Sequence, residues 1–316
     1  MLTRREFFKF FAYTALAGMS LGGYAIAIEP SRLSVARYRV RPRNWPEGLS
    51  LRIAALADLH ACEPWMNVQR IRRIVAQTNS LKPDVIVLLG DYSTGHRYTS
   101  AQIHSRDWSK ALSGLNAPLG VHAILGNHDW WDDLTAQKTG MGPTYGQRAL
   151  ERHGINVLHN QARRLDQQGT GFWVAGLGDQ LALTPNRQVG RRRWQGLDDL
   201  PGTLAQVTDD APVLLLAHEP DIFPQVPDRV ALTLCGHTHG GQVRIMGYSP
   251  VVPSRYGNRY TYGHVIEQGR HMIVSGGLGC SIVPVRFGMP PEITLVEIGT
   301  GRLRDRSSPV MESLAG

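Results

Sequence analysis

Five apolar segments of this 316-residue chain are each followed directly by side chains that bind metal ions. The segments are short and rich in Val, Ile and Leu, which is typical of strands buried in a sheet. In α/β folds the functional side chains gather at the carboxyl edge of such strands, so this pattern constrains the fold strongly. The segments and the side chains after them are Leu51–Leu56 with Asp58 and His60, Val85–Leu89 with Asp91, Val121–Leu125 with Asn127, Val213–Leu216 with His218, and Val230–Leu234 with His237 and His239.

No single part of this pattern is specific, because a lone buried histidine is more often a hydrogen-bonded core residue than a ligand. The combination of D-L-H, G-D, G-N-H-D, H and G-H-T-H, each at a strand end, predicts a metal site. Carboxylate, imidazole and amide ligands suit Mn, Fe, Zn or Ni, whereas the three cysteines lack the spacing of a structural zinc site. The sequence contains neither a G-x-S-x-G nucleophile elbow nor a P-loop, so we expect no covalent nucleophile.

The apolar periodicity predicts an α/β chain in which strands alternate with helices. Helical spacing covers Val68–Asn79, and further helices are expected over 100–115, Thr144–His153 and 197–205. Additional strands are expected near 156–158, 171–177, Met272–Ser275 and Ile293–Ile298, with a polar loop over 178–210. No linker-like segment divides the chain after residue 50, so we expect one domain, over residues 49–300, of packed sheets with helices outside.

The amino terminus has the pattern of a targeting segment. Residues 1–9 are basic, residues 10–28 are uncharged, and Ala25-Ile26-Ala27 matches a signal-peptidase site. The string Thr3-Arg4-Arg5-Glu6-Phe7-Phe8-Lys9 resembles the twin-arginine export motif. Residues 1–27 are therefore interpreted as a signal peptide of this type or, since the apolar stretch is nearly long enough to span a bilayer, as a retained anchor.

The segments that flank the predicted domain are polar. Residues 28–48 form a basic lead-in that contains an alternating strand with Arg37, Arg39 and Arg41 on one face. We interpret it as an edge strand kept soluble by its charge; contact with anionic lipid is the alternative. Residues 301–316 are expected to be a polar tail.

The metal-ligand blocks resemble those of the calcineurin-like metallophosphoesterases in both type and order, over about residues 49–298. The strings G-H-T-H-G-G-Q, G-L-G-C-S and P-V-R-F-G-M-P-P-E resemble a bacterial branch of exported and membrane-associated phosphodiesterases, which is related to enzymes that cleave lipid A precursors. The resemblance implies a four-layer αββα sandwich of two mixed sheets flanked by helices. It also implies a dinuclear metal site at the carboxyl ends of the strands.

The same resemblance assigns roles to individual residues. Asp58, His60 and His239 would hold one divalent metal ion, Asn127, His218 and His237 would hold the second, and Asp91 would bridge them. His128 would protonate the leaving group or stabilise the transition state, and Asp129 would orient His128. Hydroxide bound to the two metals would attack the phosphate directly.

Several other residues are candidates for substrate contacts. Arg286 could clamp a phosphate, Trp130 could stack on a sugar, a base or an acyl chain, and His96 could line the cleft. The adjacent Trp131 could stack on the same groups as Trp130. A disulfide between Cys62 and Cys280 is left open, although a pair of free thiols is favoured.

These features together predict an exported, metal-dependent phosphohydrolase that cleaves a phosphodiester or pyrophosphate bond. We expect it in the periplasm or on the periplasmic face of the inner membrane, with the twin-arginine machinery as its export partner. The alternatives are a pyrophosphatase for a lipid-linked nucleotide such as UDP-diacylglucosamine, and a non-catalytic phosphate-binding protein on the same fold. The net charge of +8 permits a nuclease, but no basic stripe interleaved with aromatics predicts a nucleic-acid partner. The oligomeric state does not follow from the sequence.

Overall fold

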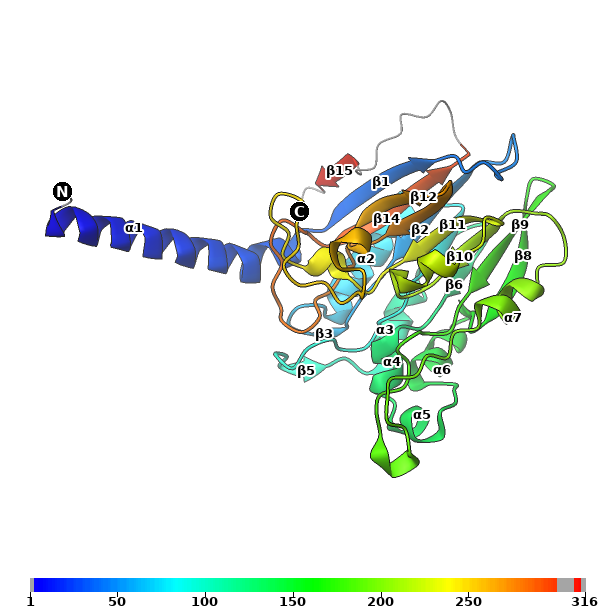
Figure 1. Cartoon of the computed structure of the whole chain (residues 1–316), viewed down its shortest axis with the longest axis horizontal. Helices are drawn as coiled ribbons and strands as arrows, with labels where there is room; N and C mark the ends of the chain where they lie inside the picture. Colours follow the sequence, from blue (N-terminus) through cyan, green and yellow to red (C-terminus); the bar gives the residue numbers. More distant parts are fainter. Residues whose placement is uncertain (1–2, 300–309, 314–316) are drawn as a thin grey trace.

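Two mixed β-sheets pack face to face in the computed structural model, which describes residues 3–299 and 310–313 (Figure 1). The first sheet has the order β15-β1-β14-β2-β4-β6-β7 and the second has the order β12-β13-β11-β10-β9-β8. The strands of the first sheet are β1 Ser34–Val40, β2 Leu51–Leu56, β4 Val85–Leu88, β6 Val121–Ala123, β7 Asn156–Val157, β14 Glu292–Ile298 and β15 Val310–Ser313. The strands of the second are β8 Gln161–Gln167, β9 Thr170–Gly176, β10 Val213–Leu216, β11 Val230–Cys235, β12 Gly263–Glu267 and β13 Arg270–Val274.

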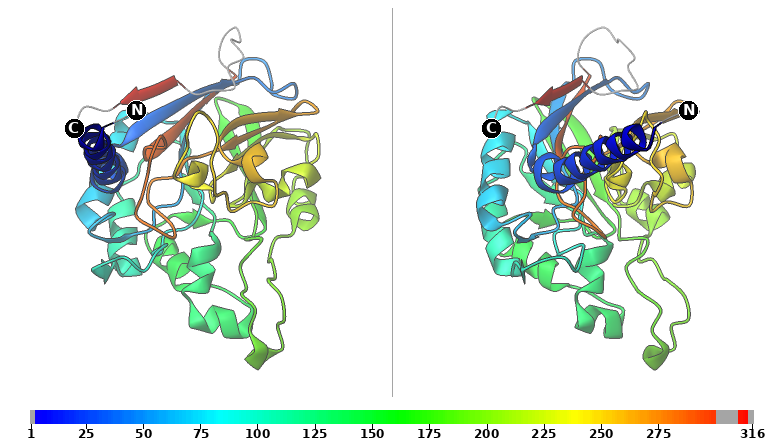
Figure 2. Two further views of the ribbon diagram at one scale, coloured as in Figure 1. Left: turned by 60° about the vertical axis from the view of Figure 1, so that its left-hand side comes forward. Right: turned by 90° about the vertical axis from the view of Figure 1, so that its left-hand side faces the viewer.

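Apolar layers cover both faces of each sheet. One layer lies between the sheets and includes Ile53, Val87, Leu214 and Leu234, all fully buried. The outer face of the first sheet is covered by α2 Val68–Ser80, α3 Ser105–Leu112 and α6 Tyr145–Glu151 (Figure 2). The outer face of the second sheet has a thinner cover, made by α7 Leu200–Ala205 and the 3₁₀ turns η4 Pro220–Gln225 and η6 Gly257–Tyr260. The predicted α/β fold of two mixed sheets with helices outside is confirmed.

The helix α2 illustrates why the sequence pattern was informative. Its buried side chains, Ile71, Ile74 and Val75, recur at helical spacing and face the first sheet. Asn67 caps its first turn by accepting a hydrogen bond from the Arg70 N–H. The predicted range of this helix is confirmed to within one residue.

Polar hairpin strands account for most of what the sequence pattern missed. The strand β8 pairs with β9, and β12 pairs with β13, in two antiparallel hairpins. Most of β8 is exposed or half-buried, so it lacks the apolar run that marked the central strands. The lead-in strand β1 was expected at a sheet edge, but it lies between β14 and β15. Residues 300–309 and 314–316 of the predicted tail lie outside the described residues.

The amino-terminal helix stands away from the folded domain (Figures 1 and 2). The helix α1 runs over Arg4–Gly23, and Thr3 and Glu6 form a capping box at its start. It continues through a π-helical turn, η1 Tyr24–Ile28, and a 3₁₀ turn, η2 Glu29–Ser31. No residue of α1 is buried. Among the described residues this is the one helix long and apolar enough to cross a membrane.

Candidate metal centre and its cleft

The candidate ligands lie in loops at the carboxyl ends of strands from both sheets. The loops after β2 and β4 are joined by backbone hydrogen bonds from Asp58 N to Gly90 O (3.1 Å) and from His60 N to Asp91 O (3.0 Å). In the second sheet, the Gly236 N–H donates to the His218 carbonyl (3.0 Å), which joins the loops after β10 and β11. The His237 N–H donates to the Asp58 carboxylate (2.9 Å), so the ligand loops of the two sheets form one connected structure.

The ligand atoms form two groups that share one carboxylate. In the first group His60 Nε2 lies 3.1 Å from His239 Nε2, and His239 Nε2 lies 3.6 Å from Asp58 Oδ1. In the second group His237 Nδ1 lies 2.9 Å from Asn127 Oδ1. Asp91 Oδ2 lies 3.6 Å from His60 Nε2 and 3.3 Å from His218 Nε2, so it faces both groups. Ligands that each lie about 2.0–2.1 Å from one metal ion are separated by such distances, so these residues fit a pair of divalent cations.

Backbone carbonyls orient two of the imidazoles toward the centre. His60 Nδ1 lies 2.8 Å from the Ser93 carbonyl oxygen, and His218 Nδ1 lies 2.6 Å from the Leu89 carbonyl oxygen. An Nδ1–H that donates to a carbonyl leaves the Nε2 lone pair free for a metal ion. The backbone therefore orients the Nε2 atoms of both imidazoles toward the centre.

Five candidate ligands adopt left-handed backbone conformations, which are costly for residues other than glycine. Their φ angles are 54° for Asp58, 46° for His60, 57° for Asp91, 70° for His237 and 52° for His239. Such strain costs about 1–3 kcal/mol per residue and persists where the surrounding structure enforces it, typically at functional sites. The D-L-H and H-T-H segments are therefore not extended, because each loop turns at both of its ligands.

Gly126 permits the close approach of two ligand loops. A Cβ atom at this position would lie 2.4 Å from Asp91 Oδ1 and 2.6 Å from His218 Cε1. A side chain here would displace the shared carboxylate. The glycine of G-N-H-D is therefore required by packing against the site, in addition to any role in the turn.

Burial dominates the protonation of the site. It raises the pKa of Asp58 to about 7, an effect that the nearby His218 opposes. It lowers the pKa of His60 to about 3, so this imidazole is neutral and can bind a cation. Burial also acts to lower the pKa of His218, but the carboxylates of Asp91, Glu219 and Asp58 together outweigh it and hold that pKa well above its usual value. A divalent cation that binds such a cluster displaces the protons it holds.

His128 is positioned at the cleft, as the sequence interpretation requires. Its ring meets His60 edge-on at a centroid distance of 5.0 Å and lies 4.9 Å from the ring of Trp131. Its backbone N–H donates to Asp91 Oδ1 (2.8 Å), which ties α4 (Asn127–Trp131) to the shared carboxylate. The side chain is half-buried and lines the cavity, so it can reach a bound ligand.

Asp129 does not orient His128, which corrects the sequence interpretation. Its carboxylate accepts backbone hydrogen bonds from Asp91 (2.8 Å), Tyr92 (2.9 Å), Ser93 (3.2 Å) and Gly126 (3.0 Å). The residue therefore fixes the loop that carries the shared carboxylate. The carboxylate that interacts electrostatically with His128 is instead Asp132, directly after α4. Burial raises the pKa of Asp132 to about 6, and the charge of His128 opposes this rise.

The predicted substrate contacts of Arg286 and Trp130 are also wrong, because both side chains are fully buried. The Arg286 guanidinium donates to the carbonyls of Gly276, Gly279 and Met289, and lies 3.3 Å from His239 Nδ1. It leaves no surface for a substrate and instead supports His239. Trp130 packs in the core beneath the cleft. His96 is buried beside Tyr98 and is not part of the cavity wall.

The cleft above the ligands is a cavity of about 460 Å³ with apolar walls. Its floor carries Asp91, Asn127, His128, His237 and His239. Its walls are formed by Trp131, Val243, Pro250, Val251, Pro253, Ile282 and Val283. Of the adjacent tryptophans it is therefore Trp131 that reaches the cleft. A ligand held here would place its charged group on the floor and apolar groups along the walls.

Two carboxylates behind His218 were missed by the sequence reasoning. Asp179 and Glu219 are buried and lie close enough to His218 for the three side chains to form a third possible ligand group. Burial, and the neighbouring Glu219, raise the pKa of Asp179 well above its usual value. The H-E-P string was the signal for Glu219, but nothing in the sequence marked Asp179. The thiols of Cys62 and Cys280 are free and buried.

The sequence profile of the calcineurin-like phosphoesterases matches residues 51–241, a range that holds every candidate ligand. The chain belongs to this family. The predicted family and the predicted metal-dependent phosphohydrolase activity are thereby confirmed.

Relatives of this phosphoesterase match it over most of their length. The uncharacterized metallophosphoesterase YkuE of Bacillus subtilis is 30% identical over 93% of this chain and 96% of its own. The phosphodiesterase YaeI of Escherichia coli is 30% identical over 94% of this chain and 100% of its own. The UDP-2,3-diacylglucosamine pyrophosphatase LpxG of Chlamydia muridarum is 24% identical over 86% of this chain and 91% of its own.

Proposed function

We propose that this phosphoesterase hydrolyses phosphodiester or pyrophosphate bonds with two divalent cations. Asp58, His60 and His239 would hold one cation, and Asn127, His218 and His237 the other. The observation that carries this proposal is the position of Asp91 Oδ2, within 3.6 Å of His60 in one group and 3.3 Å of His218 in the other. Mn, Fe, Zn and Ni all suit this mixture of carboxylate, imidazole and amide ligands.

When bound, the two cations supply an acidified water and positive charge for the phosphate oxygens. The protein residues then have distinct tasks. The strained loops fix the donors before the substrate arrives, and Asp129 holds the loop of Asp91. His128, half-buried at the cavity wall, donates a proton to the oxygen of the departing group. Trp131 packs against His128 and restricts its ring.

The apolar cleft supports a substrate with a substituent on both sides of the phosphorus. A monoester presents only its dianionic phosphate and one ester group, whereas a diester or pyrophosphate also has a group to place along the walls around Val251 and Ile282. The relative YaeI of Escherichia coli is a phosphodiesterase, which agrees with this preference.

The substrate preference is tested with the purified full chain and a panel of monoesters, diesters, nucleotide sugars and phospholipids. Each compound is assayed with Mn, Fe, Ni and Zn in turn. We expect diesters or pyrophosphates to exceed monoesters in kcat/KM by at least about tenfold, the effect of roughly 1.4 kcal/mol of differential binding along the walls. Equal kcat/KM values for monoesters and diesters would contradict the preference.

A lipid-linked nucleotide is the second candidate, and the position of the cleft favours it. Val283 on the cleft wall is three residues from Arg286, so the two lie within about 11 Å of each other along the chain. The Arg286 N–H donates to the Ala25 carbonyl at the base of α1 (2.9 Å). One wall of the cleft therefore lies near the point at which the apolar helix leaves the domain. The side of the membrane on which the domain lies decides between the two candidate substrates, because lipid-linked nucleotides of this class are processed at the cytoplasmic face.

We further propose that α1 is retained as a membrane anchor. Ala25 is buried and Glu29 accepts a hydrogen bond from Met289 N (2.6 Å), so the chain on both sides of the exposed residues Ile26 and Ala27 is attached to the folded domain. The outward side chains Phe8, Phe11 and Met19 are all more than half exposed, and a helix that is apolar on every side requires lipid around it. We propose that the twin-arginine route places the domain on the periplasmic face.

Basic residues flank the apolar segment on both sides, so the distribution of charge does not by itself set the orientation. The ones before it are Arg4, Arg5 and Lys9, and the ones after it are Arg32, Arg37, Arg39, Arg41 and Arg43. The paired arginines in the export-like motif carry the proposal of translocation instead.

Retention and export are tested together in cells. We expect the native chain to stay in the membrane fraction after an alkaline carbonate wash and to have the intact mass of the uncleaved sequence. Protease added to spheroplasts should digest the domain, and Arg4→Lys with Arg5→Lys should protect it, because the twin-arginine machinery requires the arginines. Lys9→Arg is the matched control. A soluble periplasmic product that begins after Ala27 would contradict retention.

A further inference from the structure

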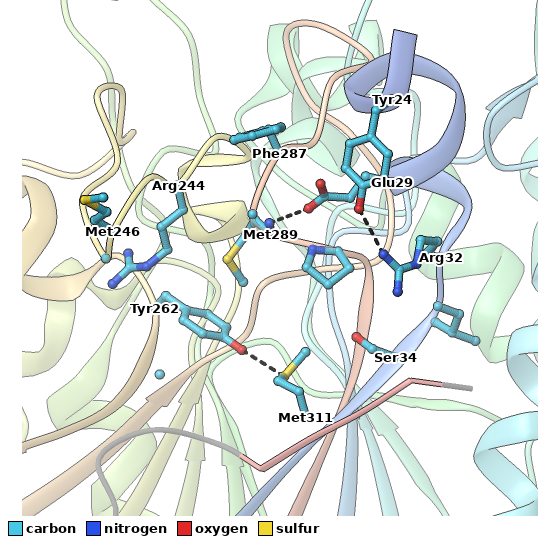
Figure 3. Close-up of a pocket in the computed structure, with 15 residues that line it drawn as sticks. Tyr24, Glu29, Arg32, Ser34, Arg244, Met246, Tyr262, Phe287, Met289 and Met311 are labelled. Carbon is cyan, nitrogen blue, oxygen red and sulfur yellow. Dashed lines mark hydrogen bonds between the residues drawn. The ribbon is translucent and has the colours of Figure 1, made fainter. Parts of the chain in front are cut away.

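A second cavity, separate from the metal cleft, lies at the base of α1 (Figure 3). Its volume is about 850 Å³, and it shares no lining residue with the metal cleft. It is bounded by Tyr24 and Arg32 from the end of the anchor, by Arg244 and Tyr262 from the second sheet's loops, and by Phe287. Figure 3 shows Arg32 and Arg244 on opposite sides of this space.

The cavity begins at the depth of the lipid headgroups if α1 spans the bilayer, so the inference rests on the proposed anchor. The uncharged stretch ends at Ile28, and Glu29 is the first charged residue after it. Tyr24 sits at this boundary, where aromatic residues gather in membrane proteins. Its ring packs edge-on against Phe287 at a centroid distance of 6.4 Å, which attaches the end of the helix to the cavity wall.

The charged groups of the cavity favour an anion. Arg32 donates to the Tyr24 hydroxyl (2.9 Å), and Arg244 lies over the Tyr262 ring with its carbon Cζ 5.7 Å from the centroid. Each guanidinium has five N–H groups, so donors remain on both after these contacts. Among the described residues of the lining, the single carboxylate belongs to Glu29, and it already accepts the Met289 N–H.

The remaining lining favours hydrocarbon. Met246 is fully exposed, Met311 is 41% exposed, and both lie at the cavity together with Met289 and Phe287. Flexible thioether side chains adapt to irregular apolar ligands. A small hydrophilic anion would leave these surfaces in water, whereas a lipid would cover them and satisfy the arginines at the same time.

We propose that this cavity binds the headgroup and upper acyl chains of an anionic phospholipid from the membrane that holds α1. The phosphate would contact Arg32 and Arg244, and the acyl chains would follow Met246, Phe287 and the outer surface of α1. Val243 lines the metal cleft and its neighbour Arg244 lines this cavity, so a bound lipid would also support one wall of the cleft.

The proposal is tested by lipid binding to the purified full chain in nanodiscs, without any substrate or metal. Spin-labelled phosphatidylglycerol and phosphatidylcholine report the motionally restricted fraction of each lipid. We expect a preference for phosphatidylglycerol that falls by about thirtyfold in the variant Arg32→Gln with Arg244→Gln, since each arginine near the surface contributes about 1 kcal/mol. Arg39→Gln with Arg41→Gln removes the same charge outside the cavity and should keep the preference.

Three outcomes overturn the proposal. The first is equal binding of the two lipids by the unaltered chain, and the second is an equal loss in the two double variants. The third is displacement of the lipid by millimolar glycerol 3-phosphate, which would mean that the site selects a free phosphate compound. Thermal melts verify that both variants fold. Because no turnover is measured, failure here is distinguishable from failure of the hydrolase assignment, and the intact mass of the same sample reports whether α1 is present.

Discussion

Replacing Asp91 by asparagine is expected to lower turnover of a phosphodiester by about a thousandfold or more. The shared oxygen, Asp91 Oδ2, is the one that faces both groups of ligands, so an amide there removes the charge that holds two cations close together. We expect the metal content to fall from about two ions per chain toward one or none. The measurements are metal content by inductively coupled plasma mass spectrometry and kcat for the same sample.

The Asp91 variant should remain folded, because the change removes a buried negative charge from beside Asp58 and its backbone contacts persist. Asp228→Asn is the matched control, since this carboxylate is 89% exposed and lies outside the cleft. His237→Ala serves as a second test, at a ligand that belongs to only one of the two groups. Turnover near that of the unaltered chain in either variant, with metal retained, would refute the assignment of the centre.

The sequence allowed the central strands and the set of candidate ligands to be predicted because both depend on local patterns. A run such as Val213–Leu216 is apolar because it is buried on both faces, and His218 follows it because strand ends meet at one edge. The loop geometry could not be predicted in the same way. The left-handed conformations at Asp58 and His237 are imposed by contacts between distant loops, such as the bond from His237 N to Asp58.

The roles of neighbouring residues were the least predictable part of the site. Asp129 is adjacent to His128 in sequence, yet the first turn of α4 points its carboxylate back toward the N–H groups of Asp91 and Tyr92. Arg286 lies in the P-V-R-F-G-M-P-P-E segment that resembles a bacterial branch of the family, yet its guanidinium is buried and donates hydrogen bonds to three backbone carbonyls. Adjacency in sequence gives no direction for a side chain, and these directions decide function.

Replacing His128 by alanine is expected to lower kcat by about 10²- to 10⁴-fold while leaving the metal content unchanged. The side chain lines the cavity beside His60 but belongs to neither group of ligands, so its loss removes proton donation without loosening the cations. The metal content of the variant is measured first. Its kcat is then measured for a series of diesters that share one retained group and differ in the acidity of the departing alcohol.

The dependence on the leaving group separates proton donation from a packing role. A general acid matters most for a basic alkoxide and little for p-nitrophenolate, which departs without a proton. We therefore expect the loss in His128→Ala to be large for alkyl diesters and small for p-nitrophenyl diesters. His153→Ala, at an exposed position outside the cleft, should lower kcat for neither class of ester. A loss of equal size for both leaving groups would instead mean that His128 supports Trp131 and the cleft wall, because misplacing the substrate slows every ester alike.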